Sequence, residues 1–189
     1  MQELFNVKNI LNEDFSILSP KICNNEILSS INDEKNNFIE VDFVKGFAML
    51  INLKKVNFTK IFDENFFLFL EEIDLCKRIK ESGEKIYIAF NAKIYHGVKA
   101  SSGNEFKIEL CRNWHWMWSL YYYNLKHFGL FYAYKITLYK FISSLLKISL
   151  SILLMQRKKY LIHKYRLLGL INAYKKKDSW LRPDHINNF

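Results

Sequence analysis

Glycine and proline, which interrupt helices and strands, are scarce in this sequence, with 6 glycines and 2 prolines among 189 residues. Their scarcity favours long regular elements over a loop-rich scaffold. The three cysteines form neither a C-x-x-C pair nor a disulfide ladder, a usage that suits a reducing cytosol. The opening residues, MQELFNVKNILNEDF, lack a basic segment followed by an apolar run, so we expect no export signal.

Apolar residues and positive charge are abundant instead. Half of the residues are hydrophobic and 16% are aromatic, a composition too apolar for a disordered chain. The length suffices for one domain plus an appendage. The formal net charge is +9, and many of the cations lie late in the sequence. Such a surface suits a nucleic acid, an anionic membrane or a phosphorylated substrate, and composition alone does not choose among them.

Hydrophobic periodicity predicts one firm helix in the first half of the chain, over residues 71–82. Acidic residues lead this helix, where its dipole favours negative charge, and Gly83 follows it at the position of a C-terminal cap. A turn is expected at Ser19–Pro20, and Gly46 marks a bulge or a close backbone approach. Short strands or apolar strand-like runs are expected at residues 15–18, 41–44, 48–53, 85–90 and 92–96.

The last part of the chain is expected to be helical. Residues 104–126 carry a broad aromatic face, and residues 130–155 form the most apolar segment. Lys135, Lys140 and Lys147 interrupt that segment, and the last two share one helix face. This pattern favours a helix that lies in the membrane interface. The alternatives are a packed helix of a soluble domain whose lysines reach water, and a membrane-spanning helix.

The tail over residues 156–177 alternates basic and apolar residues. It suits an anionic leaflet, since clustered lysine and arginine beside an amphipathic helix strengthen attraction to such a surface. A solvated basic helix is the alternative for this tail. We therefore expect two regions in the chain, residues 1–103 and residues 104–189, of which the second associates with a membrane.

The candidate catalytic residues form an acidic cluster at the start of the predicted helix, Glu71, Glu72 and Asp74, with His96 downstream. Three carboxylates within four residues repel one another unless a cation compensates. Arg78 is one candidate, because it lies one helical turn after Asp74; a divalent metal or the hydroxyls of a sugar acceptor are others. Without further context, the same residues also fit an acidic helix start, an ordinary surface ion pair and a structural histidine.

The order of the motifs around this cluster resembles the second half of bacterial family 2 glycosyltransferases, especially the rhamnosyltransferase-like enzymes of surface polysaccharide assembly. The resemblance covers about residues 41–103. It runs through VKGFAMLI at 44–51, IFDENFFL at 61–68, EEIDLCKR at 71–78, GEKIY at 83–87 and the segment from 96 to 102. The combination is more specific than any one of its parts.

The resemblance implies an α/β fold class: an incomplete GT-A (Rossmann-like) acceptor-side half, residues 1–103, followed by C-terminal amphipathic helices. It implies that Glu72 is the catalytic base, at a position where aspartate is commoner in the family. Glu71 and Asp74 would then position the base and the acceptor. A carboxylate in this role removes the proton of an acceptor hydroxyl as that hydroxyl attacks the anomeric carbon.

The resemblance also places Gly46, Met49 and Arg78 at the substrate-binding site. His96 matches a histidine that in some relatives helps to hold a divalent metal, Mg²⁺ or Mn²⁺, beside the nucleotide diphosphate. Such a metal neutralises the charge that develops on the departing diphosphate.

The implied reaction is the inverting transfer of a sugar, with rhamnose from dTDP-rhamnose as the best single candidate, from a nucleotide-sugar donor to a cell-surface polysaccharide or lipid-linked glycan acceptor. The implied location is peripheral, at the cytoplasmic face of the bacterial inner membrane. The sequence contains no Asp-x-Asp motif and no counterpart of the family's nucleotide-binding half. We therefore expect a truncated or split enzyme that is inactive alone and has a separately encoded N-terminal half as partner.

Two other interpretations stay open. In the first, the chain is a catalytically inactive remnant or a membrane-associated partner subunit. In the second, its charge and its aromatic residues serve nucleic-acid binding. The second is weaker, because the basic residues alternate with leucine and isoleucine and no nucleic-acid motif appears. We therefore expect no nucleic-acid partner.

Overall fold

The computed structural model describes residues 15–22, 38–56, 58–94 and 105–186. The chain divides into two compact units, Met1–Asp63 with Glu71–Ala100 (unit 1) and Glu64–Leu70 with Ser101–Phe189 (unit 2). The described part of unit 1 holds a small mixed sheet and helix α2, and unit 2 is a helical bundle, so the chain is a mixed α/β protein. Residues 64–70 belong to unit 2, although the sequence pattern alone places them in the first region.

Unit 1 is built on a four-stranded sheet with the order β2-β4-β1-β3. The strands are β1 Ile17–Ile22, β2 Phe38–Glu40, β3 Leu50–Ile51 and β4 Ile86–Ile94. The central strands β1 and β4 are parallel, whereas β3 and β2 run antiparallel to them at the two edges. A parallel pair needs a crossover connection, and helix α2, Glu71–Glu81, lies within that crossover and contacts β4.

Several expected strand boundaries are wrong. β1 continues through Ser19–Pro20, where a turn is expected, because Pro20 lies at a register shift in the β1–β4 ladder. A residue without an amide hydrogen is tolerated at such an irregularity. Residues 41–44 are not a strand, since β2 ends at Glu40. The two strands expected at 85–90 and 92–96 are the single strand β4, whose pairing with β1 resumes after the shift.

Helix α2 confirms the helix predicted over residues 71–82. Gly83 has φ +81°, the left-handed conformation that favours glycine, and ends the helix as expected. Its amide donates to the Lys80 carbonyl at 3.0 Å, and the Glu84 amide donates to the Ile79 carbonyl at 3.2 Å, which is a Schellman motif. The buried apolar residues of this core come from α2, the sheet and the intervening loops: Ile17, Val44, Val56, Leu75, Cys76, Ile79 and Ile86.

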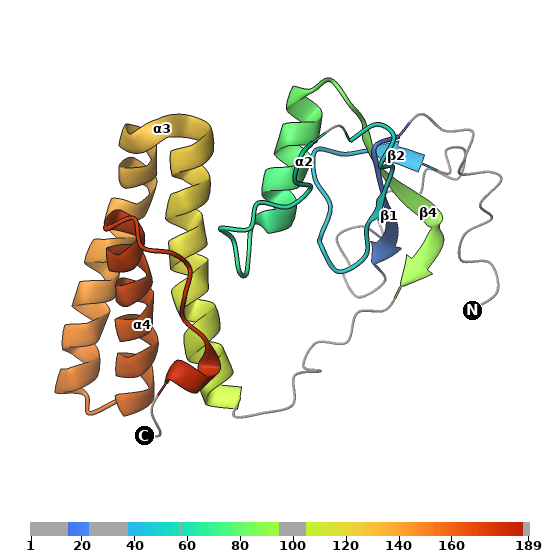
Figure 1. The fold of residues 1–189 in the computed structure, drawn as a ribbon. Coiled ribbons are helices and arrows are strands. Elements are labelled where there is room, and N and C mark those ends of the chain that lie inside the picture. The colour runs from blue at the N-terminus through green and yellow to red at the C-terminus, as the bar shows by residue number, and fades with distance from the viewer. Residues whose placement is uncertain (1–14, 23–37, 57, 95–104, 187–189) are drawn as a thin grey trace. The chain divides into compact units, whose positions relative to one another are not determined.

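Unit 2 contains the helices α3, Glu105–Leu153, and α4, Arg157–Tyr174, and a short 3-10 helix, η2, Pro183–His185. Gly129 interrupts α3 with φ +83° and ψ 174°, a combination open essentially to glycine alone, so the chain reverses there. Figure 1 shows the two arms of α3 running in opposite directions beside α4. The rings of Tyr121 and Tyr134 are accordingly 5.4 Å apart, whereas a continuous helix would separate them by about 20 Å. The helices expected at 104–126 and 130–155 are these two arms.

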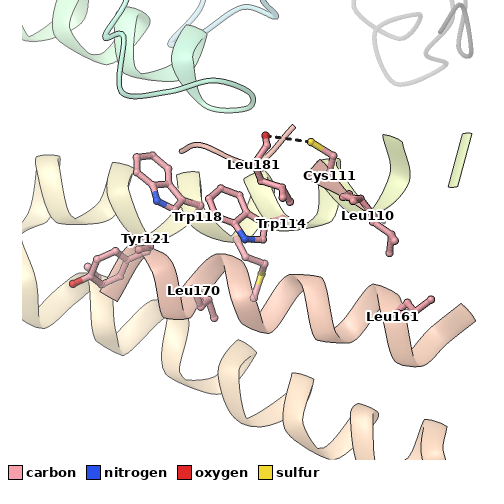
Figure 2. Close-up of a cluster of buried hydrophobic side chains, with 12 residues drawn as sticks. Leu110, Cys111, Trp114, Trp118, Tyr121, Leu161, Leu170 and Leu181 are labelled. Carbon is pink, nitrogen blue, oxygen red and sulfur yellow. Dashed lines mark hydrogen bonds between the residues drawn. The ribbon is translucent and has the colours of Figure 1, made fainter. Parts of the chain in front are cut away.

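The core of unit 2 lies between the first arm of α3 and α4, and the C-terminal segment closes it (Figure 2). Trp114 and Met117 are fully buried there together with Leu170. Leu181 returns to the first arm, where its carbonyl accepts hydrogen bonds from the Cys111 thiol at 3.6 Å and the His115 ring at 2.8 Å. Cys76 and Cys111 are buried and serve as small core residues.

Within the part of the chain that the structure describes, α3 is the one helix long and apolar enough to cross a membrane, by length and composition alone. Only 17% of its most apolar window is buried. Its second arm therefore presents a largely uncovered apolar surface.

Candidate functional site

The acidic cluster lies in the first turn of α2, and the chain enters that turn through two residues in the left-handed region. Phe69 has φ +70° and Leu70 has φ +68°, although neither is a glycine. Each such residue costs roughly 1–3 kcal/mol, and such backbone strain often accompanies functional sites. The local sequence explains the helix start, because Glu71, Glu72 and Asp74 face the positive end of the helix dipole.

The loop before β3 passes directly over Glu72. A Cβ atom placed on Gly46 would lie 3.2 Å from the Glu72 Cβ and 3.8 Å from its carboxyl carbon. One turn along the helix, Val44 is buried in the same core cluster as Cys76. The loop is therefore held against one face of α2 at two points, and glycine at position 46 permits the closer approach.

This arrangement desolvates the proposed base. Burial raises the pKa of Glu72, and the neighbouring charge of Glu71 adds to the rise. The amides of residues 72 and 73 and the Lys45 ammonium group oppose it. A carboxyl group with a raised pKa is a better proton acceptor once ionised, so Glu72 has the property that general-base catalysis requires.

Two carboxylate oxygens of the cluster are buried without partners. Among the described residues, no hydrogen-bond donor reaches the Oε2 atom of Glu71 or the Oε2 atom of Glu72. A buried, unpaired carboxylate oxygen is costly, so a hydrogen-bond donor such as a sugar hydroxyl would stabilise either atom.

Asp74 differs from its two neighbours, because it is fully buried and already paired. Its Oδ2 accepts a hydrogen bond from Arg78 Nε at 2.9 Å. The same guanidinium donates to the carbonyls of Lys60 and Ile61 and packs on the Phe58 ring at 4.8 Å. The pair thus ties α2 to the preceding loop, and the role of Asp74 in positioning the base stays a prediction.

The remaining predicted site residues are less informative. Met49 is half-buried and packs on the core beneath α2, and its role at a substrate site stays a prediction. His96 lies outside the described residues. No three histidine, cysteine, aspartate or glutamate side chains converge as a metal site within the described segments. The divalent metal therefore also stays a prediction.

The sequence pattern did not predict the cavity that the structure shows in unit 2. This cavity has a volume of about 340 Å³, and its lining includes Asn65, Trp118, Tyr122 and Lys177. Asn65 donates to the Tyr122 hydroxyl at 2.9 Å, and the Trp118 indole donates to the Lys177 carbonyl at 2.8 Å. The run of aromatic residues was the only feature of the sequence that pointed to this cavity. It did not show that residues 64–70 and 176–178 would lie beside those aromatic side chains.

Fold and site together define a mixed α/β protein with a desolvated carboxylate on helix α2, which contacts the sheet. Comparison of the chain with protein-family models, curated proteins and solved structures gives no match. The site geometry and the motif order must therefore carry the functional argument.

Proposed function

We propose that the chain is the acceptor-side part of an inverting glycosyltransferase and that Glu72 is its catalytic base. The observation that carries the proposal is the contact of Gly46 with Glu72, which joins two of the motifs on which the family resemblance rests. These motifs are 26 residues apart in the sequence, and the contact brings them to one place. The raised pKa of Glu72 and its unpaired Oε2 support the same role.

In this mechanism, the Glu72 carboxylate accepts the proton of an acceptor hydroxyl. The acceptor oxygen forms a bond to the anomeric carbon of the donor, and the bond from that carbon to the diphosphate oxygen breaks on the opposite face. The nucleoside diphosphate leaves with the bonding electrons, and the configuration at the anomeric carbon inverts. The Glu71 carboxylate, with its own unpaired oxygen, orients the acceptor through a second hydroxyl.

The proposed acceptor is a lipid-linked glycan at the cytoplasmic face of the bacterial inner membrane. Large apolar side chains of the second α3 arm support this location, since Phe131, Leu146 and Leu153 are 84%, 67% and 79% exposed. A separately encoded nucleotide-binding half would supply the donor, with dTDP-rhamnose as the first donor to test. Mg²⁺ or Mn²⁺ would be included in every assay.

The test measures the transfer of labelled rhamnose to a lipid-linked glycan by the chain, alone and combined with a nucleotide-binding partner half. Glu72→Gln should lower the rate by about 10²–10⁴-fold, the range that general-base removal produces. Asp42→Asn is the matched control, because Asp42 is an exposed carboxylate of the same unit and should leave the rate unchanged. Retained transfer in the Glu72→Gln variant would remove Glu72 from the mechanism.

The alternative function is a non-catalytic, membrane-associated partner subunit, and the exposed second arm of α3 is the observation that favours it. Stable association with a partner half without sugar transfer, together with vesicle binding, would support this alternative. Restored transfer on mixing would exclude it.

A further inference from the structure

The turn between α3 and α4 places an apolar side chain where a small residue is usual. The amides of Met155 and Gln156 donate to the carbonyls of Ile152 and Ser151, at 3.0 and 2.8 Å, in a Schellman motif. Met155 has φ +52°, although this position favours glycine because a side chain costs roughly 1–2 kcal/mol there. Its side chain is 92% exposed. The fold therefore gains nothing evident from methionine at this position.

Beside this turn, positive charge collects without acidic partners. Residues 110–177 contain no aspartate or glutamate. Lys147 on α3 and Lys159 and Arg166 on α4 lie close enough to His163 that their charges lower its pKa, although burial is the larger cause. Three cations from two helices thus surround one imidazole, an arrangement that a bound anion would stabilise.

Two nitrogen atoms of this group lack a hydrogen-bond acceptor in the part of the chain that the structure describes. His163 Nδ1 and Arg166 Nε are buried, and no hydrogen-bond acceptor reaches either atom among the described residues. Both belong to α4 and are three residues apart, so they lie on the same helix face. A phosphate group offers the oxygen acceptors that a guanidinium and an imidazole would satisfy.

Apolar side chains continue from the turn along the exposed surface of the second α3 arm. This stripe has near-helical spacing and consists of Phe131, Leu138, Ile142, Leu146, Leu150 and Leu153. A cavity of about 340 Å³ at the turn, lined by Met155, Arg157 and Tyr160 among others, adjoins it. An apolar stripe bordered by cations is the pattern of a helix that lies in a lipid headgroup layer.

We propose that the α3–α4 hairpin docks on an anionic phospholipid surface and that Lys147, Lys159, His163 and Arg166 bind the phosphate of a lipid headgroup. Met155 and the apolar stripe enter the boundary between headgroups and acyl chains. The proposal rests on the membrane location in the proposed function and is independent of the chemistry at Glu72.

The experiment is co-flotation of the full chain with phosphatidylcholine vesicles, with and without phosphatidylglycerol. We expect binding only when phosphatidylglycerol is present. Arg166→Gln should weaken binding about fivefold, as the loss of roughly one basic contact predicts. Arg112→Gln removes the same charge from the first α3 arm and should change binding much less. Circular dichroism would verify that both variants keep their helices.

Met155→Gly provides a second, opposite readout. Glycine relieves the left-handed strain, so thermal stability should rise, while loss of the apolar side chain should weaken vesicle binding. If Met155 has only a structural role, Met155→Gly will leave vesicle binding unchanged. That result would overturn the proposed insertion of Met155 into the membrane.

Three outcomes would overturn the headgroup site: equal losses in Arg166→Gln and Arg112→Gln, equal binding to vesicles without phosphatidylglycerol, or binding of inorganic phosphate without any vesicle binding. Failure of the proposed function would give a different result from failure of the headgroup site. Glu72→Gln would leave sugar transfer intact, and the unaltered chain would still bind vesicles.

Discussion

The backbone of Gly46 lies so close to Glu72 that a Cβ atom on Gly46 would stand 3.2 Å from the Glu72 Cβ. This contact fixes where the loop before β3 passes over α2. It also excludes water from one side of the Glu72 carboxyl group, which raises the pKa of that group.

Gly46→Val should therefore destabilise unit 1 by about 1–3 kcal/mol, the usual cost of overpacking. All four tryptophans, at positions 114, 116, 118 and 180, belong to unit 2, so fluorescence does not report on unit 1. Hydrogen exchange of the α2 amides is the suitable measurement. Glu72→Gly removes the Cβ atom that a side chain at position 46 would meet first, so it should recover part of the loss in a double-mutant cycle. Strictly additive effects would contradict the close approach.

Glu72→Gln should stabilise unit 1 at neutral pH. Above the ordinary glutamate pKa of 4.5, the folded state holds the Glu72 proton more tightly than the unfolded chain, so ionisation costs stability as the pH rises. Below 4.5 both states are protonated, and the difference between glutamate and glutamine should vanish. Slower α2 exchange in the variant at pH 7 than in the parent chain, converging on acidification, is the expected result. No pH dependence of that difference would mean that Glu72 is not desolvated.

Removing Asp74 or Arg78 should be far more damaging than removing a surface pair on the same helix. Asp74→Ala leaves the guanidinium without its buried carboxylate, and breaking a buried pair costs roughly 3–5 kcal/mol. Lys77→Gln is the control, because the Lys77–Glu81 pair has the same i,i+4 spacing but is partly exposed to solvent, and such a pair is worth at most about 1 kcal/mol. Hydrogen exchange of α2 would compare the two, and similar losses would show that the Asp74 pair is energetically ordinary.

Gly169→Ala should destabilise unit 2, although alanine usually favours a helix over glycine by about 1 kcal/mol. A Cβ atom at position 169 would lie 2.3 Å from the Trp114 carbonyl oxygen, so α4 and the first α3 arm must separate. The expected loss is about 1–3 kcal/mol, measured by tryptophan fluorescence in denaturant. Ser149→Ala, on the exposed side of α3, should show no such loss. A stabilised Gly169→Ala variant would contradict the close helix packing.

Some of the fold and site was predictable because it is encoded locally. The apolar spacing of α2, its leading acids and the glycine after it all lie within about a dozen residues, and the helix matches the prediction. The strands were predicted less well. β4 is one strand because β1 pairs along it, and Pro20 is tolerated within β1 because the ladder shifts register there. Neither cause is visible in the local sequence of β1 or β4.

The sequence by itself determined that a row of carboxylates opens a helix, that a cap ends it and that an apolar, lysine-bearing segment follows later in the chain. Only the tertiary structure decided that Asp74 is buried against Arg78 while Glu72 keeps an unpaired oxygen beneath Gly46. It also brought Lys147 of α3 close to His163 of α4. The physical reason is that helix propensity and capping act between near neighbours in the sequence. Desolvation and charge–charge interaction depend on which distant residues the fold places within a few ångströms.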